Sequence, residues 1–234
     1  IRYVIASPGT TNNALIGSIQ KDPFFTIFSS VDERSAAYMA CGLAAETNEP
    51  VVISCTGATA SRNYAPGMTE AYYRKLPVLA ITSTQQIGRI GHHVAQVIDR
   101  SVISNDVANF SVTLPVVKDE EDFWDCEVKV NQAILELTRN GGGPVHINLP
   151  TTYSKPFTEK EGIQCRVINR IEFNDAFPEI SENSKVAVFI GSHKNWKKEE
   201  TKALEEFCEA YNAVVFCDHT SGYRGKNRLF FSLA

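Results

Sequence analysis

The sequence predicts an α/β fold: a doubly wound, six-stranded parallel sheet with helices on both faces, followed by the start of a second α/β domain. Short apolar runs alternate with stretches of helical periodicity, a pattern typical of strands joined by right-handed crossovers. The run at residues 51–54 is nearly all apolar, as expected for a strand covered on both faces. A chain of 234 residues with 43% hydrophobic residues can fill such a core.

Local signals place the elements. Thr10 or Thr11 is expected to cap the first helix, and Asp32 is the expected N-cap of the second, with Glu33 in its first turn. The positive end of the helix favours both acids. The expected strands are residues 3–6, 24–28, 51–54, 77–82, 111–116 and 143–149, and the helices after the first are about 33–46, 63–73 and 120–139.

The rest of the chain divides into a loop, a linker and a second unit. Residues 83–110 are polar and weakly periodic, as functional loops are. We expect a first domain over residues 1–156, a linker over 157–184 that is rich in charges and prolines, and a truncated central α/β domain over 185–234. A strand-like start and an end without a helix stop suggest part of a longer protein.

Composition favours small-molecule partners in the cytoplasm. The formal net charge of −4 comes without a long basic run, so the sequence predicts neither nucleic-acid nor anionic-membrane binding. The longest apolar run falls short of the roughly 18 residues that span a bilayer. Six cysteines occur without a CxxC pair, which favours free, buried thiols in a reducing, cytoplasmic compartment.

Familiar single motifs are absent or have a structural explanation. The sequence contains no GxGxxG, GxxxxGK[ST] or HExxH motif. His92-His93 lacks acidic or cysteine partners at useful spacing, so we interpret it as a solvated loop pair rather than a metal site. Cys55 follows a strand as a nucleophile can, but a buried structural thiol is the favoured interpretation. Glu33 alone is explained by the helix dipole.

The combination of motifs says more than any one of them. In order, the sequence carries Ser7-Pro8-Gly9, then residues 32–37 with Gly42-Leu43-Ala44, then Thr56-Gly57 with Asn63, then residues 77–82, and then residues 143–150. This series resembles the pyrimidine-binding domain of thiamine diphosphate-dependent enzymes. The most similar branches are the menaquinone-pathway succinyl-enolpyruvyl-hydroxycyclohexene-carboxylate synthases and the acetolactate synthases. The resemblance spans residues 1 to about 156.

The resemblance implies a role for each matching residue. Glu33 matches the catalytic glutamate that hydrogen-bonds the aminopyrimidine ring nitrogen of the cofactor, and Gln96 falls where the family places a glutamine reaching the reacting centre. Seven residues are implied to contact the cofactor: Ser7, Pro8, Gly9, Glu33, Thr56, Gly57 and Asn63.

The resemblance also implies a reaction. The expected function is decarboxylation or carboligation, or both, of a 2-oxo acid by a homodimer or homotetramer. Magnesium is expected on a C-terminal domain outside this chain, so the chain alone is expected to be inactive. The competing hypothesis is a non-catalytic α/β ligand-binding or subunit-assembly module that has kept the fold.

Overall fold

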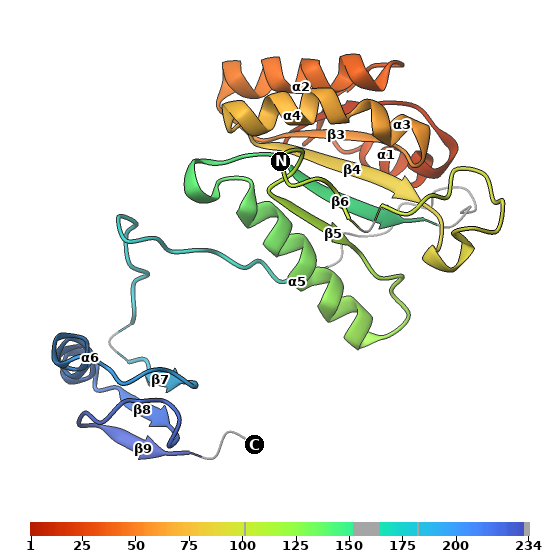
Figure 1. Ribbon diagram of the computed structural model, residues 1–234. Coiled ribbons are helices and arrows are strands. Elements are labelled where there is room, and N and C mark those ends of the chain that lie inside the picture. The colour runs from red at the N-terminus through yellow and green to blue at the C-terminus, as the bar shows by residue number, and fades with distance from the viewer. Residues whose placement is uncertain (101, 152–163, 182, 232–234) are drawn as a thin grey trace. The chain divides into compact units, whose positions relative to one another are not determined.

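The chain folds as two units, each built around a parallel sheet. The computed structural model describes residues 1–100, 102–151, 164–181 and 183–231 (Figure 1). The first unit is Ile1–Arg170 and the second is Ile171–Ala234. In the first unit, six strands form one sheet in the order β2-β1-β3-β4-β6-β5, and every neighbouring pair is parallel. The predicted doubly wound sheet is confirmed.

The elements of the first unit lie close to their predicted positions. The strands are β1 Tyr3–Ala6, β2 Thr26–Ser29, β3 Val51–Thr56, β4 Val78–Thr84, β5 Phe110–Thr113 and β6 Val145–Pro150. The helices are α1 Asn13–Ile19, α2 Glu33–Thr47, α3 Thr59–Asn63, α4 Ala65–Arg74 and α5 Glu120–Glu136.

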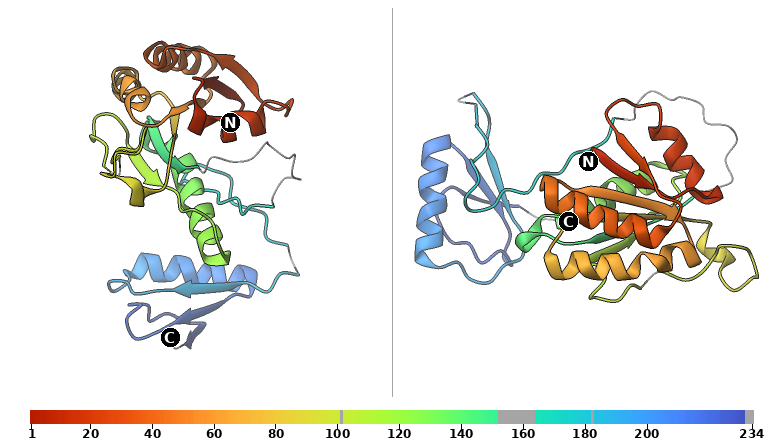
Figure 2. Two further views of the ribbon diagram at one scale, coloured as in Figure 1. Left: turned by 90° about the vertical axis from the view of Figure 1, so that its right-hand side faces the viewer. Right: turned by 90° about the horizontal axis from the view of Figure 1, so that it is seen from above.

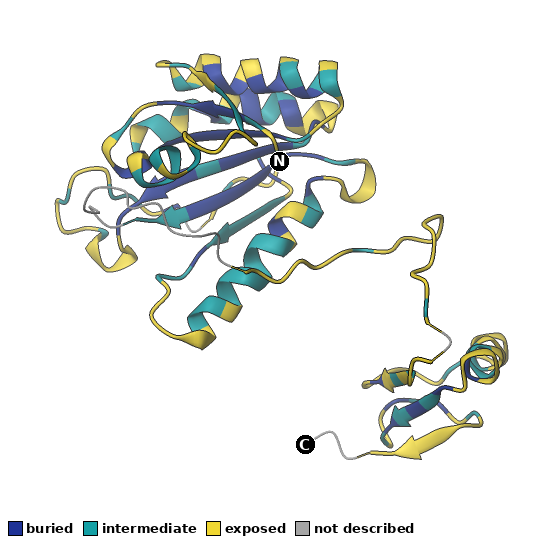
Figure 3. Ribbon diagram, turned by 180° about the vertical axis from the view of Figure 1, so that it is seen from behind, coloured by how far each residue is buried: buried dark blue, intermediate teal, exposed yellow. Residues whose placement is uncertain are grey.

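Alternation along the strands builds a core on each face of this sheet. Ile5 and Ile53 pack with the small residues of α2 and α4 on one face. Val4 and Val52, one residue earlier in each strand, pack with α1 and α5 on the opposite face. Figure 1 shows α2 and α4 above the strands and α5 below them, and Figure 3 shows the central strands buried.

The start of α2 forms as the sequence predicts. The Asp32 side chain accepts a hydrogen bond of 2.8 Å from the Ser35 backbone amide, which satisfies an otherwise unpaired donor of the first turn. The helix then packs closely on α4, because a Cβ on Gly67 would lie only 2.4 Å from the Ala37 Cβ. This contact holds the N-terminus of α2 above the carboxyl end of the sheet.

The predicted threonine cap of the first helix is wrong. A 3₁₀ turn, Thr10–Asn12, precedes α1, and neither turn nor helix has a side-chain cap. The Thr11 hydroxyl instead donates to the Ser83 carbonyl oxygen at 3.0 Å. A contact with a residue far along the chain therefore replaces the local cap. The helix predicted over 63–73 is also divided, with α3 ending before Tyr64 and Pro66 in the first turn of α4.

The second unit is a small three-stranded sheet with one helix. Its elements are β7 Ala187–Ile190, α6 Lys198–Tyr211, β8 Val214–Cys217 and β9 Arg228–Phe230, and the strands are parallel in the order β7-β8-β9. Figure 2 shows the strands of this unit beside α6.

The predicted linker lies partly outside the described residues. Residues 164–181, which the structure describes, contain neither helix nor strand, but residues 157–163 and 182 of the predicted linker are not among those described. The predicted boundaries at 156 and 185 therefore stay predictions. No helix in the described part of the chain combines the length and hydrophobicity that a membrane crossing requires.

Candidate functional site

Two predicted turns meet at the point where the strand order of the sheet reverses. β1 pairs with β2 on one side and with β3 on the other. In open parallel sheets, ligands bind outside the carboxyl ends of strands at such a switch point. Ser7-Pro8-Gly9 follows the carboxyl end of β1, and Thr56-Gly57 stands at the end of β3. The fold thus brings together two motifs that are separated by about fifty residues in the sequence.

The two turns are in direct contact. A Cβ built on Gly9 would lie 1.8 Å from Thr56 Oγ1 and 2.8 Å from Thr56 Cβ. The backbone of Gly9 is extended, with φ 172°, so the need for glycine here comes from close approach and not from a left-handed conformation. The next turn is also tight, because the Gly57 amide donates to the Ser83 carbonyl at 2.6 Å.

Gly9→Ala is therefore expected to destabilise the first unit by about 1–3 kcal/mol, the usual range for overpacking a well-filled site. The double variant Gly9→Ala/Thr56→Gly removes the clashing side chain and is expected to recover part of that loss. Urea unfolding of the single and double variants measures both values. Equal stability of Gly9→Ala and wild type would contradict the contact.

A buried asparagine joins the turn after β1 to strands β3 and β4. Asn12 Nδ2 donates to the Ser7 carbonyl at 3.0 Å, and its Oδ1 accepts from Ser54 Oγ at 2.5 Å and from Ser83 Oγ at 3.3 Å. All four residues are buried. Sequence reasoning missed Asn12, because a lone asparagine after a threonine pair carries no signal of such long-range partners.

Three hydroxyl groups close to this network have no partner. Ser7 Oγ, Thr56 Oγ1 and the Tyr64 hydroxyl are buried, and none meets the geometry of a hydrogen bond with a described residue, although Tyr64 lies close enough to Ser7 and Cys55 for both to act on its pKa. Most buried polar atoms in folded proteins are paired, and an unpaired one costs about 1–3 kcal/mol. Their grouping at the end of β1 and β3 indicates a place where another molecule supplies the partners.

Glu33 is the first residue of α2 and is half-buried. Its carboxylate forms no hydrogen bond or ion pair within the described part of the chain. It lies near Cys55 and Tyr64: burial is the main cause that raises the pKa of each, to about 12 for the thiol, and the Glu33 charge raises both further. Cys55 is thus a neutral buried thiol, as expected from the sequence for a structural cysteine rather than a nucleophile.

Other predicted site residues lie less centrally. Pro8 is exposed beside Ser7, and Asn63 is half-buried at the end of α3. Gln96 is exposed on the loop after β4, with φ 61°. No hydrogen bond in the described residues joins the side chain of Asn63 or Gln96 to the unpaired hydroxyls. The structure therefore brings Ser7, Gly9, Thr56 and Gly57 together and places Glu33 near Cys55 and Tyr64.

A buried arginine is the other group that sequence reasoning missed. A Cβ on Gly57 would lie 3.1 Å from Arg100 Nη2 and 3.2 Å from its Nη1, so the guanidinium packs against the Thr56-Gly57 turn. Arg100 Nη2 donates to Asn148 Oδ1 at 2.5 Å. In the described residues, no three His, Cys, Asp or Glu side chains gather as metal ligands.

Comparison with known proteins identifies the first unit. Residues 1–103 match the model of the family described as thiamine pyrophosphate enzyme, N-terminal TPP binding domain. The first unit is an N-terminal domain of the thiamine diphosphate-dependent enzymes. The TPP-binding domain model thus covers the strands and turns of the candidate site from β1 to β4.

Curated relatives of this TPP-binding domain share one name, 2-succinyl-5-enolpyruvyl-6-hydroxy-3-cyclohexene-1-carboxylate synthase. The protein of Bacteroides thetaiotaomicron is 33% identical over 218 residues, which are 87% of this chain and 39% of that protein. The protein of Phocaeicola vulgatus is 36% identical over 175 residues, 74% of this chain and 31% of that protein. The chain thus spans about two fifths or less of the length of these relatives.

Solved structures show the same fold. Benzoylformate decarboxylase from Polynucleobacter necessarius aligns with a TM-score of 0.58 at 17% identity, over 93% of this chain and 40% of that one. A putative thiamin diphosphate-dependent enzyme from Mycobacterium smegmatis aligns with a TM-score of 0.57 at 16% identity, over 94% of this chain and 42% of that one. At these identities the likeness concerns the fold alone.

Proposed function

We propose that the intact protein is a thiamine diphosphate-dependent enzyme that converts a 2-oxo acid, by decarboxylation, carboligation or both, and that Glu33 activates the aminopyrimidine of the cofactor. One observation carries the proposal: an unpaired carboxylate at the N-terminus of α2 lies near buried, unpaired hydroxyls at the strand-order switch point. The family match and the synthase relatives support the class of reaction.

The residues present fit an aminopyrimidine. This flat ring carries nitrogen acceptors and an amino donor, which suit the unpaired hydroxyls of Ser7 and Thr56. Gly9 lets the Ser7-Pro8-Gly9 turn pack against Thr56, which keeps the two turns and their hydroxyls together. Bound thiamine diphosphate supplies a nucleophilic carbon for the carbonyl of the substrate and an electron sink for the departing carbon dioxide.

Glu33 is suited to hold a proton at the ring nitrogen. Its position in the first turn of α2 places the carboxylate at the positive end of the helix dipole, and no protein group competes for its oxygens among the described residues. The apolar surroundings that raise the pKa of Cys55 exclude water on one side. A carboxylate in this place can accept a proton from the cofactor and return it.

The remaining expectations belong to the intact protein. Magnesium and the diphosphate end of the cofactor are assigned to a part of the protein beyond this chain, as the family resemblance implies. Assembly as a homodimer or homotetramer and a cytoplasmic location rest on the same resemblance. The relatives are more than twice as long as the segment matched here.

The test uses the intact protein that contains this sequence. Calorimetric titration with thiamine diphosphate and Mg²⁺ is expected to show binding, and a panel of 2-oxo acids with small, acidic and aromatic side chains is expected to show cofactor-dependent release of carbon dioxide for at least one member. Absence of both binding and turnover would favour the non-catalytic ligand-binding or subunit-assembly module instead.

A further inference from the structure

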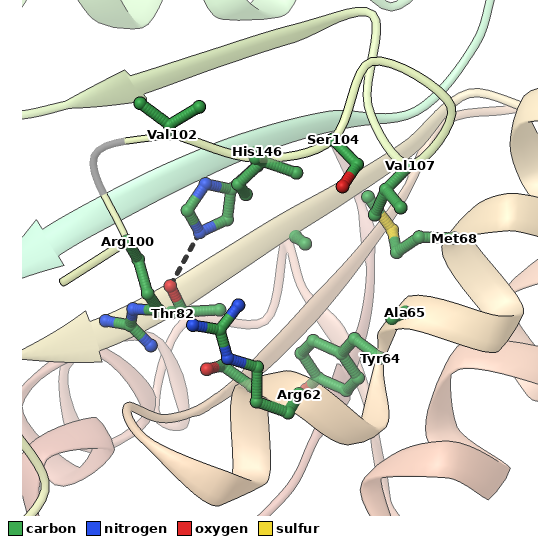
Figure 4. A pocket seen from close by; sticks show the side chains of 13 residues that line it. Arg62, Tyr64, Ala65, Met68, Thr82, Arg100, Val102, Ser104, Val107 and His146 are labelled. Carbon is green, nitrogen blue, oxygen red and sulfur yellow. Dashed lines mark hydrogen bonds between the residues drawn. The ribbon is translucent and has the colours of Figure 1, made fainter. Parts of the chain in front are cut away.

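A cavity of about 150 Å³ in the first unit adjoins the candidate cofactor site and shares Tyr64 with it. Figure 4 shows Arg62, Arg100 and Thr82 at one end of it and Met68 and Val107 at the other. None of Ser7, Gly9, Glu33 and Thr56 lines it.

Arg100 enters the polar end with most of its hydrogen-bonding capacity unused. The residue is only 4% exposed, and its Nε and Nη1 have no partner in the described part of the chain. Its one side-chain hydrogen bond there runs from Nη2 to Asn148. Burying a charged group with unpaired donors is costly unless a partner satisfies them.

No carboxylate is among the groups that shift the pKa of Arg100. Burial lowers its pKa to about 10, and the charges that act on it are those of Cys55 and Arg62. Since burial raises the Cys55 pKa to about 12, the thiol is neutral at pH 7 while the guanidinium stays charged. His146 is neutral as well, with a pKa lowered by burial to about 3, and its Nε2 pairs with Thr82 at 2.7 Å.

We propose that this cavity binds a small organic carboxylate with a compact apolar body, and that a carboxylate oxygen accepts a hydrogen bond from Arg100 Nη1. A hydrogen bond from a guanidinium to a carboxylate joins two ionised groups and is roughly twice as strong as one between neutral groups. Arg62 adds a second positive charge at the mouth.

The other end of the cavity selects a carboxylate over free phosphate. Met68, Ala80 and Val107 offer apolar walls, which favour hydrocarbon and leave the outer oxygens of a phosphate unpaired. An apolar cavity of about this volume accommodates a benzene ring. Benzoate and branched short-chain carboxylates are therefore the matching sizes.

The two methionines of the chain provide a site-specific test. Met68 lines the cavity, whereas Met39 is exposed on α2. Titration of the full chain, labelled with ¹³C at its methionine methyl groups, with benzoate is expected to shift the Met68 signal saturably, with a Kd in about the millimolar range or below, and to leave Met39 in place. Inorganic phosphate at the same ionic strength is expected to cause no such shift.

Variants identify the anchoring residue. Arg100→Gln is expected to weaken benzoate binding by about tenfold or more, as for loss of a charged hydrogen-bond donor. Arg62→Gln, which alters an exposed residue and leaves the core intact, is expected to weaken it several-fold. Arg74→Gln removes the same charge from α4 outside the cavity and is the control. An unmoved Met68 signal, a Met68 shift with phosphate alone, or full binding by Arg62→Gln and Arg100→Gln would overturn the proposal.

Discussion

Replacing Glu33 with glutamine is expected to lower turnover of the intact protein by about 10²–10⁴-fold, the usual contribution of a positioned acid–base group. Glutamine keeps the size and the helix position of the side chain but cannot share a proton with the ring nitrogen. Because Glu33 makes no hydrogen bond to the described residues, the fold is expected to stay unchanged. Steady-state rates at saturating cofactor measure the effect.

Glu46→Gln is the matched control for this experiment. Glu46 lies on the same helix and is exposed. Its replacement by glutamine removes the same charge as Glu33→Gln. Its turnover is expected to equal that of the wild type. If Glu33→Gln also kept wild-type turnover at saturating thiamine diphosphate, Glu33 would have no acid–base role.

The buried imidazole of His146 is expected to make the first unit sensitive to acid. Nε2 pairs with Thr82 Oγ1 at 2.7 Å and Nδ1 with Ser111 Oγ at 2.8 Å, and either tautomer suits hydroxyls that both donate and accept. Burial, and next the Arg100 charge, lower its pKa to about 3. The ordinary pKa of 6.5 applies in the unfolded chain.

The direction in which stability changes with pH follows from proton uptake by the unfolded chain. As pH falls below 6.5, the unfolded chain binds a proton at this residue and the folded chain does not, so stability present above pH 6.5 is lost progressively toward pH 3. Between about pH 6 and 4, the wild type is expected to lose about 1.4 kcal/mol more per pH unit than His146→Gln. Urea unfolding, followed by Trp124 fluorescence in a Trp196→Phe background, measures both slopes.

Ser111→Ala separates this titration from the hydrogen bond. It removes one partner of the imidazole but leaves His146 buried, so it is expected to lower stability at every pH without changing the slope. Parallel pH profiles for the wild type and His146→Gln would contradict a neutral, buried imidazole.

Much of the fold could be predicted because its signals are local. Apolar runs with turns between them located the strands, and Asp32 with Ser35 three residues later forms a cap within a single turn. The sequence also places Gly9 and Thr56 near each other, because each follows directly on an apolar run that predicts a strand.

Other features depend on partners far along the chain and left no local trace. Thr11 is a residue type that often caps helices, so the sequence predicted a cap. Its hydroxyl instead donates to the Ser83 carbonyl oxygen. Tyr64 and Arg100 matter because they are buried without partners, and burial arises only when α3, α4 and the loop after β4 are packed together. Periodicity does not encode that arrangement.

Glu33 and the turns after β1 and β3 are expected to hold the aminopyrimidine. A crystal structure of the intact protein with thiamine diphosphate and Mg²⁺ tests it most directly. The expected result is a Glu33 carboxylate oxygen at about 2.6–3.2 Å from the pyrimidine ring nitrogen, with the ring against Gly9 and Thr56-Gly57. A bound cofactor whose pyrimidine touches neither Glu33 nor these turns would contradict it.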